Sequence, residues 1–295
     1  MAVVPRSLVA VDGSLYIPKD KSSLMKMIEG GQSQNYTAHT GKDMASKRVL
    51  IVDAMEVVQS ITKTTKMTKV IHFQEEFLKR ISKLMKGYDE GRIVFDKYLD
   101  QSLKNKTRLI RSKSSAEYAV HPDMSLTMSI KDLLSASSTK RRLTVMLAEA
   151  TLDHFIKQQQ IRIIVVYDDK IRKSESPDQI EFHTHEEADT LIPQQVLDCQ
   201  SEYAALDIPL EISVDSPDTD VLTLNLHLDA QGHLKESTKQ LFITGKKTKN
   251  TSRRIVDIRE RVKVLGTEKS KPLIGFHNFA GADWGGNFNR VSKQK

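Results

Sequence analysis

The stretch that decides the fold is Ile212-Ser-Val-Asp-Ser-Pro-Asp-Thr-Asp-Val-Leu-Thr-Leu224. A short apolar, β-branched run predicts a buried strand, and the Ser-Pro pair that begins at Ser216 predicts the start of a helix. Asp215 closes the strand, whereas Asp218 and Asp220 stand at the helix start. In open α/β sheets the binding crevice lies beyond the carboxyl ends of the parallel strands. The acids therefore mark a candidate site, provided that other acids reach the same edge.

Other segments repeat this pattern of a short apolar run followed by an acid. Residues 48–53, 92–96 and 161–167 are predicted strands, and Asp168 follows the last of them directly. Apolar periodicity predicts helices in the intervening segments, with Gly87 ending the first and Pro193 expected to kink or shorten the last. These helices cover residues 70–85, 139–160 and 186–203, and a hairpin (241–245 and 254–257) and a helix ending near Gly266 follow. Strands alternating with helices predict an α/β fold with a doubly wound, mainly parallel central sheet flanked by helices.

The first 45 residues differ from the rest and are predicted to form an N-terminal extension and linker. They contain a short apolar run at 8–11, a possible helix at 19–29 that Gly30 would end, and a polar, turn-rich segment at 32–42. Residues 46–295 are then expected to form the main domain. A total of 295 residues is enough for one large domain with such an extension.

Charge and composition limit the class of protein. The chain has 45 Lys+Arg and 38 Asp+Glu, a formal net charge of +7, which gives a moderate bias toward polyanionic partners. A single cysteine, Cys199, excludes an internal disulfide and fits a reducing compartment. No apolar run reaches the roughly 18 residues of a membrane helix, and Arg6 and Asp12 interrupt any signal-peptide core. We expect a nuclear or cytoplasmic protein that is neither secreted nor bound to a membrane.

Five acidic positions stand at predicted strand ends, helix starts or turns. They are Asp53, Asp96, Glu186 with Glu187 and Asp189, Asp218 with Asp220, and Asp283. Carboxylate oxygens are the ligands that Mg²⁺ and Mn²⁺ prefer, and two such ions need several carboxylates in one small volume. Each acid also has a structural explanation. Thr184 and Glu187 fit a capping box, and Asp218 favours the dipole of a helix beginning near Ser216.

The five segments that carry these acids resemble, in their order along the chain, the acidic motifs of the flap endonuclease superfamily, a branch of the PIN-like nucleases. The segments are Lys47-Arg-Val-Leu-Ile-Val-Asp-Ala-Met55, Ile93-Val-Phe-Asp96, Glu187-Ala-Asp189, Asp218-Thr-Asp220 and Gly281-Ala-Asp283-Trp. The resemblance covers about residues 47–288, with all five segments in the family's order. The sequences of residues 185–190, 216–222 and 276–283 also resemble those of uncharacterised, mobile-element-associated members of that superfamily.

The resemblance implies a Mg²⁺- or Mn²⁺-dependent nuclease that cuts DNA or RNA with two metal ions. It assigns one ion to Asp53, Asp96, Glu187 and Asp189, and the second to Asp218, Asp220 and Asp283. A basic run falls where the family carries a substrate-gating helical segment. Its cations, which either contact nucleic-acid phosphates or form a solvated face, are Lys104, Lys106, Arg108, Arg111 and Lys113.

The chain departs from the family after the last acidic motif. Where structure-specific members continue into a helical duplex-binding motif, this chain runs Trp284-Gly-Gly-Asn-Phe-Asn-Arg and ends at Lys295. This predicts a fragment or a protein without the C-terminal helical region. The alternative function is a catalytically inactive PIN-like module that binds nucleic acid or a protein partner.

Three weaker sequence features concern other kinds of site: an aspartate pair like that of a phosphatase, a pair of histidines, and the single cysteine. The pair Asp218 and Asp220 resembles the aspartates of haloacid-type phosphatases, although that pair belongs to the first strand of its fold. His183 and His185 lie two residues apart, a spacing that suits no common zinc site. We expect them to be loop histidines and Cys199 to be a core residue.

Overall fold

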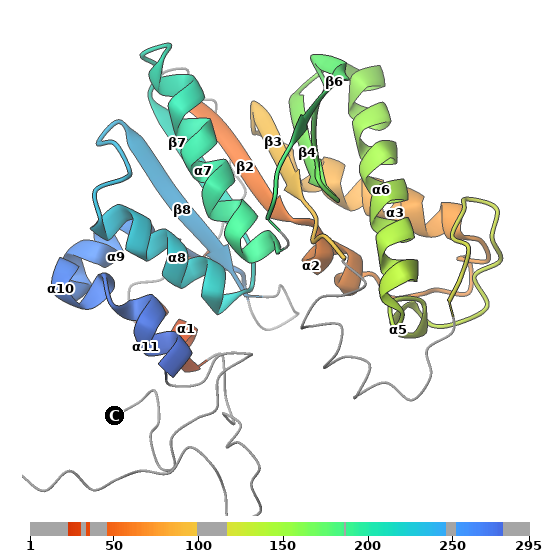
Figure 1. Cartoon of the computed structure of the whole chain (residues 1–295), viewed down its shortest axis with the longest axis horizontal. Coiled ribbons are helices and arrows are strands. Elements are labelled where there is room, and N and C mark those ends of the chain that lie inside the picture. Colours follow the sequence, from red (N-terminus) through yellow and green to blue (C-terminus); the bar gives the residue numbers. More distant parts are fainter. Residues whose placement is uncertain are drawn as a thin grey trace, which may run out of the picture. The chain divides into compact units, whose positions relative to one another are not determined.

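The protein is described by a computed structural model, which covers residues 23–30, 34–35, 46–98, 117–185, 187–245 and 252–279. The chain forms two compact units, shown as ribbons in Figure 1. The first unit is Ala38–Asp215, and the second combines Met1–Thr37 with Ser216–Lys295. The boundary between them follows the last strand of the first unit.

The first unit is an α/β structure built on a mixed, mostly parallel sheet. Its strands follow the order β7-β2-β3-β4-β5-β6. They are β2 (Lys47–Asp53), β3 (Glu90–Val94), β4 (Arg162–Tyr167), β5 (Lys170–Lys173), β6 (Ser176–Phe182) and β7 (Leu210–Asp215). The four strands from β7 to β4 are parallel, whereas β5 and β6 form an antiparallel hairpin beside β4. The predicted α/β fold with a mainly parallel sheet is therefore confirmed.

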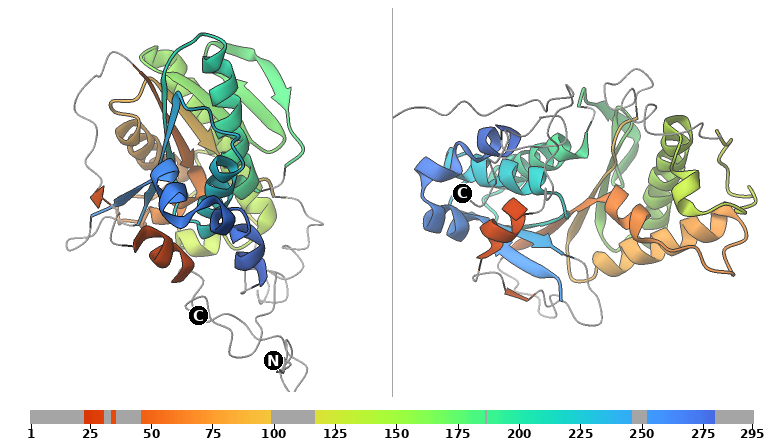
Figure 2. Two further views of the ribbon diagram at one scale, coloured as in Figure 1. Left: turned by 90° about the vertical axis from the view of Figure 1, so that its left-hand side faces the viewer. Right: turned by 90° about the horizontal axis from the view of Figure 1, so that it is seen from below.

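Helices cover the parallel strands and bury them. They are α2 (Ala54–Ser60), α3 (Val70–Leu84), α5 (Ile130–Leu133), α6 (Ser137–Gln158) and α7 (Ala188–Ala204). Helix α7 packs on β2, β3 and β7, while α6 packs on β4 and on α3, and α6 and α3 lie next to each other in the right-hand view of Figure 2. The apolar stripe of α3 supplies Phe73, Phe77 and Ile81 to the core, all 0% exposed. Because β2, β3, β4 and β7 are parallel, their carboxyl ends lie along one edge of the sheet.

Register brings the ends of these strands close together. Val52 pairs with Asp215, and Asp53 pairs with Val94. The acids that follow β2 and β3 are consequently neighbours at the carboxyl edge, as expected for parallel strands. Helix α7 begins at this edge and continues through Pro193 to Ala204, so Pro193, which was expected to kink or shorten the helix, does not shorten it.

The second unit consists of small antiparallel strands and short helices. Its elements are α1 (Ser23–Glu29), β1 (Gln34–Asn35), α8 (Thr219–Ala230), β8 (Thr238–Thr244), β9 (Arg254–Asp257), α9 (Ile258–Leu265), α10 (Thr267–Ser270) and α11 (Leu273–Phe279). Strands β8 and β9 form the predicted hairpin, and β1 pairs with the other side of β9. Helix α1 packs on α8, and its Glu29 pairs with Arg254 at 2.7 Å. The short N-terminal helix is thus part of the second unit.

Among the helices that the structure describes, none is both long and apolar enough to cross a membrane.

Candidate metal centre

Asp53 occupies the junction between β2 and α2. The strand before it is buried and apolar, and the carboxylate caps the following helix: Oδ1 accepts hydrogen bonds from the backbone N–H groups of Met55 at 3.0 Å and Glu56 at 3.2 Å. Burial, followed by the negative charge of Asp96, raises the pKa of Asp53 from 3.8 to about 7, although the two backbone donors oppose this. The fold therefore holds a carboxylate in a place that disfavours its charge.

Asp96 connects the sheet edge to the start of α7. It lies two residues beyond β3, after the backbone N–H of Phe95 has donated to the carbonyl of Val166. Its Oδ1 accepts a hydrogen bond from the backbone N–H of Ala188 at 3.0 Å, and Oδ2 accepts one from the Tyr98 hydroxyl at 3.3 Å. Because Ala188 is the first residue of α7, Asp96 fixes the point at which this helix meets the sheet edge.

The start of α7 carries the next predicted ligands. Glu187 is the N-cap residue, but its side chain accepts no capping hydrogen bond from a backbone N–H of the helix. Asp189 lies in the first helical turn. The capping box predicted between Thr184 and Glu187 is wrong, because the helix begins four residues after Thr184. The explanation of Glu187 as the third helical residue of a capping box therefore fails. Glu186 lies outside the residues that the structure describes.

Asp218 and Asp220 stand at the start of α8, a helix of the second unit. Asp218 is the N-cap and its Oδ1 accepts a hydrogen bond from the backbone N–H of Asp220 at 2.9 Å. Ser216, at the predicted helix start, instead accepts a hydrogen bond from the Asp218 backbone at 3.2 Å. The helix thus begins two residues later than the Ser-Pro signal suggested. The capping role predicted for this segment is real, and Asp218 performs it.

His277 is a contact of this site that sequence reasoning missed. It lies on α11, is only 4% exposed, and places Nε2 2.5 Å from Oδ1 of Asp220. The packing of α11 against α8 brings together two residues that are 57 positions apart in the chain. In the sequence, His277 stood out only as part of residues 276–283, which resemble a segment of the flap endonuclease superfamily. No spacing signal linked it to Asp220.

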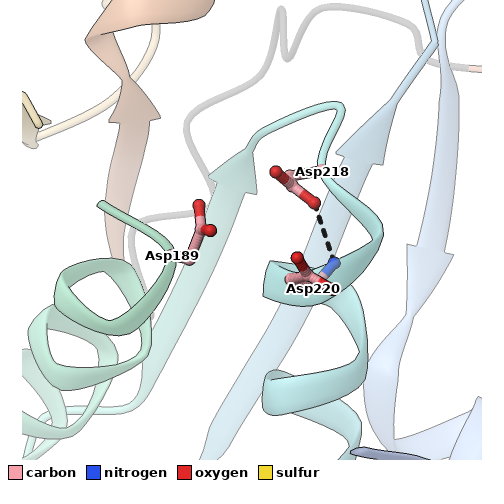
Figure 3. A group of neighbouring side chains, drawn as sticks. All are labelled: Asp189, Asp218 and Asp220. Carbon is pink, nitrogen blue, oxygen red and sulfur yellow. Dashed lines mark hydrogen bonds between the residues drawn. The ribbon is translucent and has the colours of Figure 1, made fainter. Parts of the chain in front are cut away.

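Three of the predicted ligands gather into one group. Asp189, Asp218 and Asp220 each offer a carboxylate oxygen, and the three atoms lie within 4.8 Å of one another. Figure 3 shows the three side chains as neighbours, with the hydrogen bond from the Asp220 backbone to Asp218 dashed. Such a group could hold a metal ion, and its oxygen donors suit a hard cation such as Mg²⁺ or Mn²⁺.

Other predicted site residues lie elsewhere. Asp283, Trp284 and the basic run are outside the described residues; the basic run comprises Lys104, Lys106, Arg108, Arg111 and Lys113. Within the described part of the chain, His183 and His185 belong to no group of three metal-binding side chains. Cys199 is buried in the core as predicted, and burial raises the pKa of its thiol to about 12.

No family model, curated protein or solved structure matches this chain. The resemblance to flap endonucleases therefore stays a prediction, and any function must be argued from the side chains and their geometry.

Proposed function

We propose that this protein is a nuclease that uses Mg²⁺ or Mn²⁺, as two ions, to hydrolyse phosphodiester bonds of DNA or RNA on a PIN-like, flap-endonuclease-like domain. The observation that carries the proposal is the nearness of Asp53 and Asp96 at the carboxyl edge of the sheet, where Asp53 pairs in register with Val94, two residues before Asp96. Their mutual repulsion contributes to a pKa of about 7 for Asp53. Structural acids gain nothing from such closeness, whereas a bound cation would remove the repulsion.

The donor set supports this chemistry. Asp189, Asp218 and Asp220 would hold one ion through one oxygen each, and Asp53 and Asp96 would supply oxygens near the start of α7. Bound divalent ions activate water, orient the phosphate and stabilise charge on the leaving oxygen. The task of the protein is to hold the carboxylates in place. Backbone N–H groups do this for Asp53, Asp96 and Asp218, each through Oδ1.

A cleavage assay tests the proposal. Purified protein is incubated with labelled single-stranded, duplex and branched DNA and RNA in Mg²⁺, in Mn²⁺ and in EDTA. We expect cutting that requires the divalent ion and that is lost in Asp96→Asn and in Asp220→Asn. Asp153→Asn is the matched control, because Asp153 is an exposed acid on α6 in the first unit. Full activity in Asp96→Asn, or no metal-dependent cutting of any substrate by the natural sequence, would refute the proposal.

A second candidate is a catalytically inactive module of the same fold that binds nucleic acid or a protein partner. The contact between His277 and Asp220 favours it, because an imidazole already stabilises one of the carboxylates without metal. A pKa of about 7 likewise lets Asp53 keep its proton in a fraction of molecules at neutral pH. This candidate predicts that oligonucleotide or partner binding is unchanged in EDTA and in Asp96→Asn.

A further inference from the structure

Strand β6 is the outer strand of the sheet, and its second half lacks the usual protection of an edge strand. In the described part of the chain its neighbour in the sheet is β5 alone. Its last five residues are exposed. Two of these are large and apolar: Ile180 is 44% exposed and Phe182 is 70% exposed. An exposed apolar strand edge is a template for pairing with another chain.

The first half of β6 is protected by its sequence and its shape. Pro177 has no backbone N–H, and its carbonyl oxygen accepts hydrogen bonds from Nε of Arg172 at 3.1 Å and from Nη2 at 2.7 Å. The pairing with β5 is also irregular here, because the register shifts between Arg172 and Lys173. The open edge is therefore the regular part that follows, residues 180–182.

The register of the β5–β6 hairpin shows which backbone groups face outward. The N–H of His183 donates to the carbonyl of Asp169, and these two residues continue the register of the hairpin. Hydrogen-bonded pairs alternate with non-hydrogen-bonded pairs in an antiparallel ladder, so Glu181 forms its hydrogen bonds toward β5. Ile180 and Phe182, on either side of it, direct their N–H and C=O groups away from β5. Each thus offers an outward donor, an outward acceptor and an exposed apolar side chain.

We propose that β6 pairs antiparallel with β6 of a second copy of this chain, so that Ile180 of each copy lies opposite Phe182 of the other. In this register both outward-facing residues meet outward-facing residues, and each facing pair exchanges both of its N–H···O hydrogen bonds. Sliding the copies until either residue meets itself leaves the other opposite the irregular half of β6 or beyond its last residue. The regular part of the edge therefore selects one register.

The side chains of this edge fit a second copy and disfavour nucleic acid. The facing pairs are apolar against apolar, and both lie on one face of the sheet. On the other face Glu181 meets Glu181 of the second copy, but Lys173 pairs with Glu181 at 2.5 Å in each copy, so the row of charges is neutral. Strand β6 contains two acids and no basic residue, so it would repel a phosphate backbone. Few side chains take part, so the dimer is smaller than a standard interface of roughly 1,200–2,000 Å² and is transient.

Sedimentation equilibrium tests the pairing. Protein from about 1 µM to about 1 mM covers dimers with Kd values in that range. Phe182→Ser removes one apolar side chain from each copy and should weaken the dimer roughly 100-fold. The matched control is Leu206→Ser, because Leu206 is 63% exposed and lies in the turn after α7, away from β6. It should leave the dimer unchanged, and circular dichroism checks that both variants are folded.

Charge and cysteine variants test the register. Glu181→Gln removes the like charges that face each other and should tighten the dimer roughly 3-fold, whereas Asp178→Asn, at an exposed acid outside the facing pairs, should not. Glu181→Cys should form a disulfide between copies under mild oxidation, because the facing Cα atoms lie about 4.5 Å apart. Ile180→Cys and Phe182→Cys should not, because each is two residues out of register with its own copy. The natural sequence is the background, since Cys199 is buried.

The outcomes decide the pairing without reference to nuclease activity. A dimer that Phe182→Ser weakens and that Glu181→Cys crosslinks supports it. A chain that stays monomeric at every concentration overturns it, and so does a dimer that Phe182→Ser and Leu206→Ser affect equally. Crosslinking through Ile180→Cys or Phe182→Cys in place of Glu181→Cys also overturns it, because the copies then meet in another register.

Discussion

Replacing Asp53 with asparagine should stabilise the protein, and the gain should grow with pH. The pKa of Asp53 is about 7 in the folded chain, against 3.8 for an ordinary aspartate, mainly because of burial and then because of Asp96. The folded state therefore keeps the proton to higher pH than the unfolded chain does, so stability falls as pH rises from about 4 to about 7. At about 1.36 kcal/mol per pKa unit, the cost is about 2 kcal/mol at pH 5 and about 4 kcal/mol at pH 8.

Asparagine removes this cost while keeping the cap. Its side-chain oxygen can accept the hydrogen bonds from Met55 and Glu56, and asparagine ranks with aspartate as an N-cap residue. Urea unfolding in EDTA at pH 5 and pH 8 measures the free-energy difference, since a bound ion would favour the carboxylate and hide the effect.

The control is Asp257→Asn. Asp257 caps α9 by accepting a hydrogen bond from the Glu260 backbone at 3.1 Å, so this variant reports the cost of changing the capping residue alone. We expect a change of a few tenths of a kcal/mol there. If Asp53→Asn is less stable than the natural sequence at pH 8, or gains equally at both pH values, the account of Asp53 as a carboxylate disfavoured by burial and by Asp96 is wrong.

Three further predictions concern other buried groups. Glu90→Gln should lose about 3–5 kcal/mol at pH 7 in urea unfolding, because the fully buried Glu90 pairs with Arg92 at 2.6 Å. Burial alone would raise the pKa of Glu90, but its partners lower it overall, so the loss should shrink as pH falls below 4.5; a constant loss would contradict this. Cys199 should react with a thiol reagent only on unfolding, since its pKa is about 12; rapid labelling of the folded protein would disprove this. His277→Phe should weaken Mn²⁺ binding roughly 10-fold in calorimetry while His277→Gln, which keeps an N–H toward Asp220, should weaken it less; equal affinities would exclude a positioning role.

The parallel strands could be predicted from the sequence because each is buried on both faces. Such strands read as continuous apolar runs, and β2 and β4 do so, whereas β7 carries Glu211 and Ser213 between its apolar residues. The edge strand β6 (Ser176–Phe182) was missed for the opposite reason. It is exposed for most of its length, includes Pro177, and lacks an apolar run. Its existence depends on pairing with β5, which a local pattern does not reveal.

The helix starts at the candidate site were harder to predict than the helices. Thr184 and Ser216 are good capping residues by type, yet Glu187 and Asp218 occupy the cap positions. The start of α7 is set by a distant residue, because the backbone N–H of Ala188 donates to Asp96, 92 positions earlier in the chain. Local capping preferences are worth about 1 kcal/mol and are readily overridden by such tertiary contacts.

Capping a helix and holding a metal ion are compatible roles for the same carboxylate. In Asp53 both backbone hydrogen bonds go to Oδ1, and in Asp218 the hydrogen bond from the backbone of Asp220 also goes to Oδ1. An oxygen fixed in this way orients the whole carboxyl group, so the position of the second oxygen is set by the helix start. The two explanations of these acids in the sequence were therefore not exclusive. When an N-cap aspartate follows a strand directly, the helix start fixes the orientation of its carboxylate at the carboxyl edge of a parallel sheet.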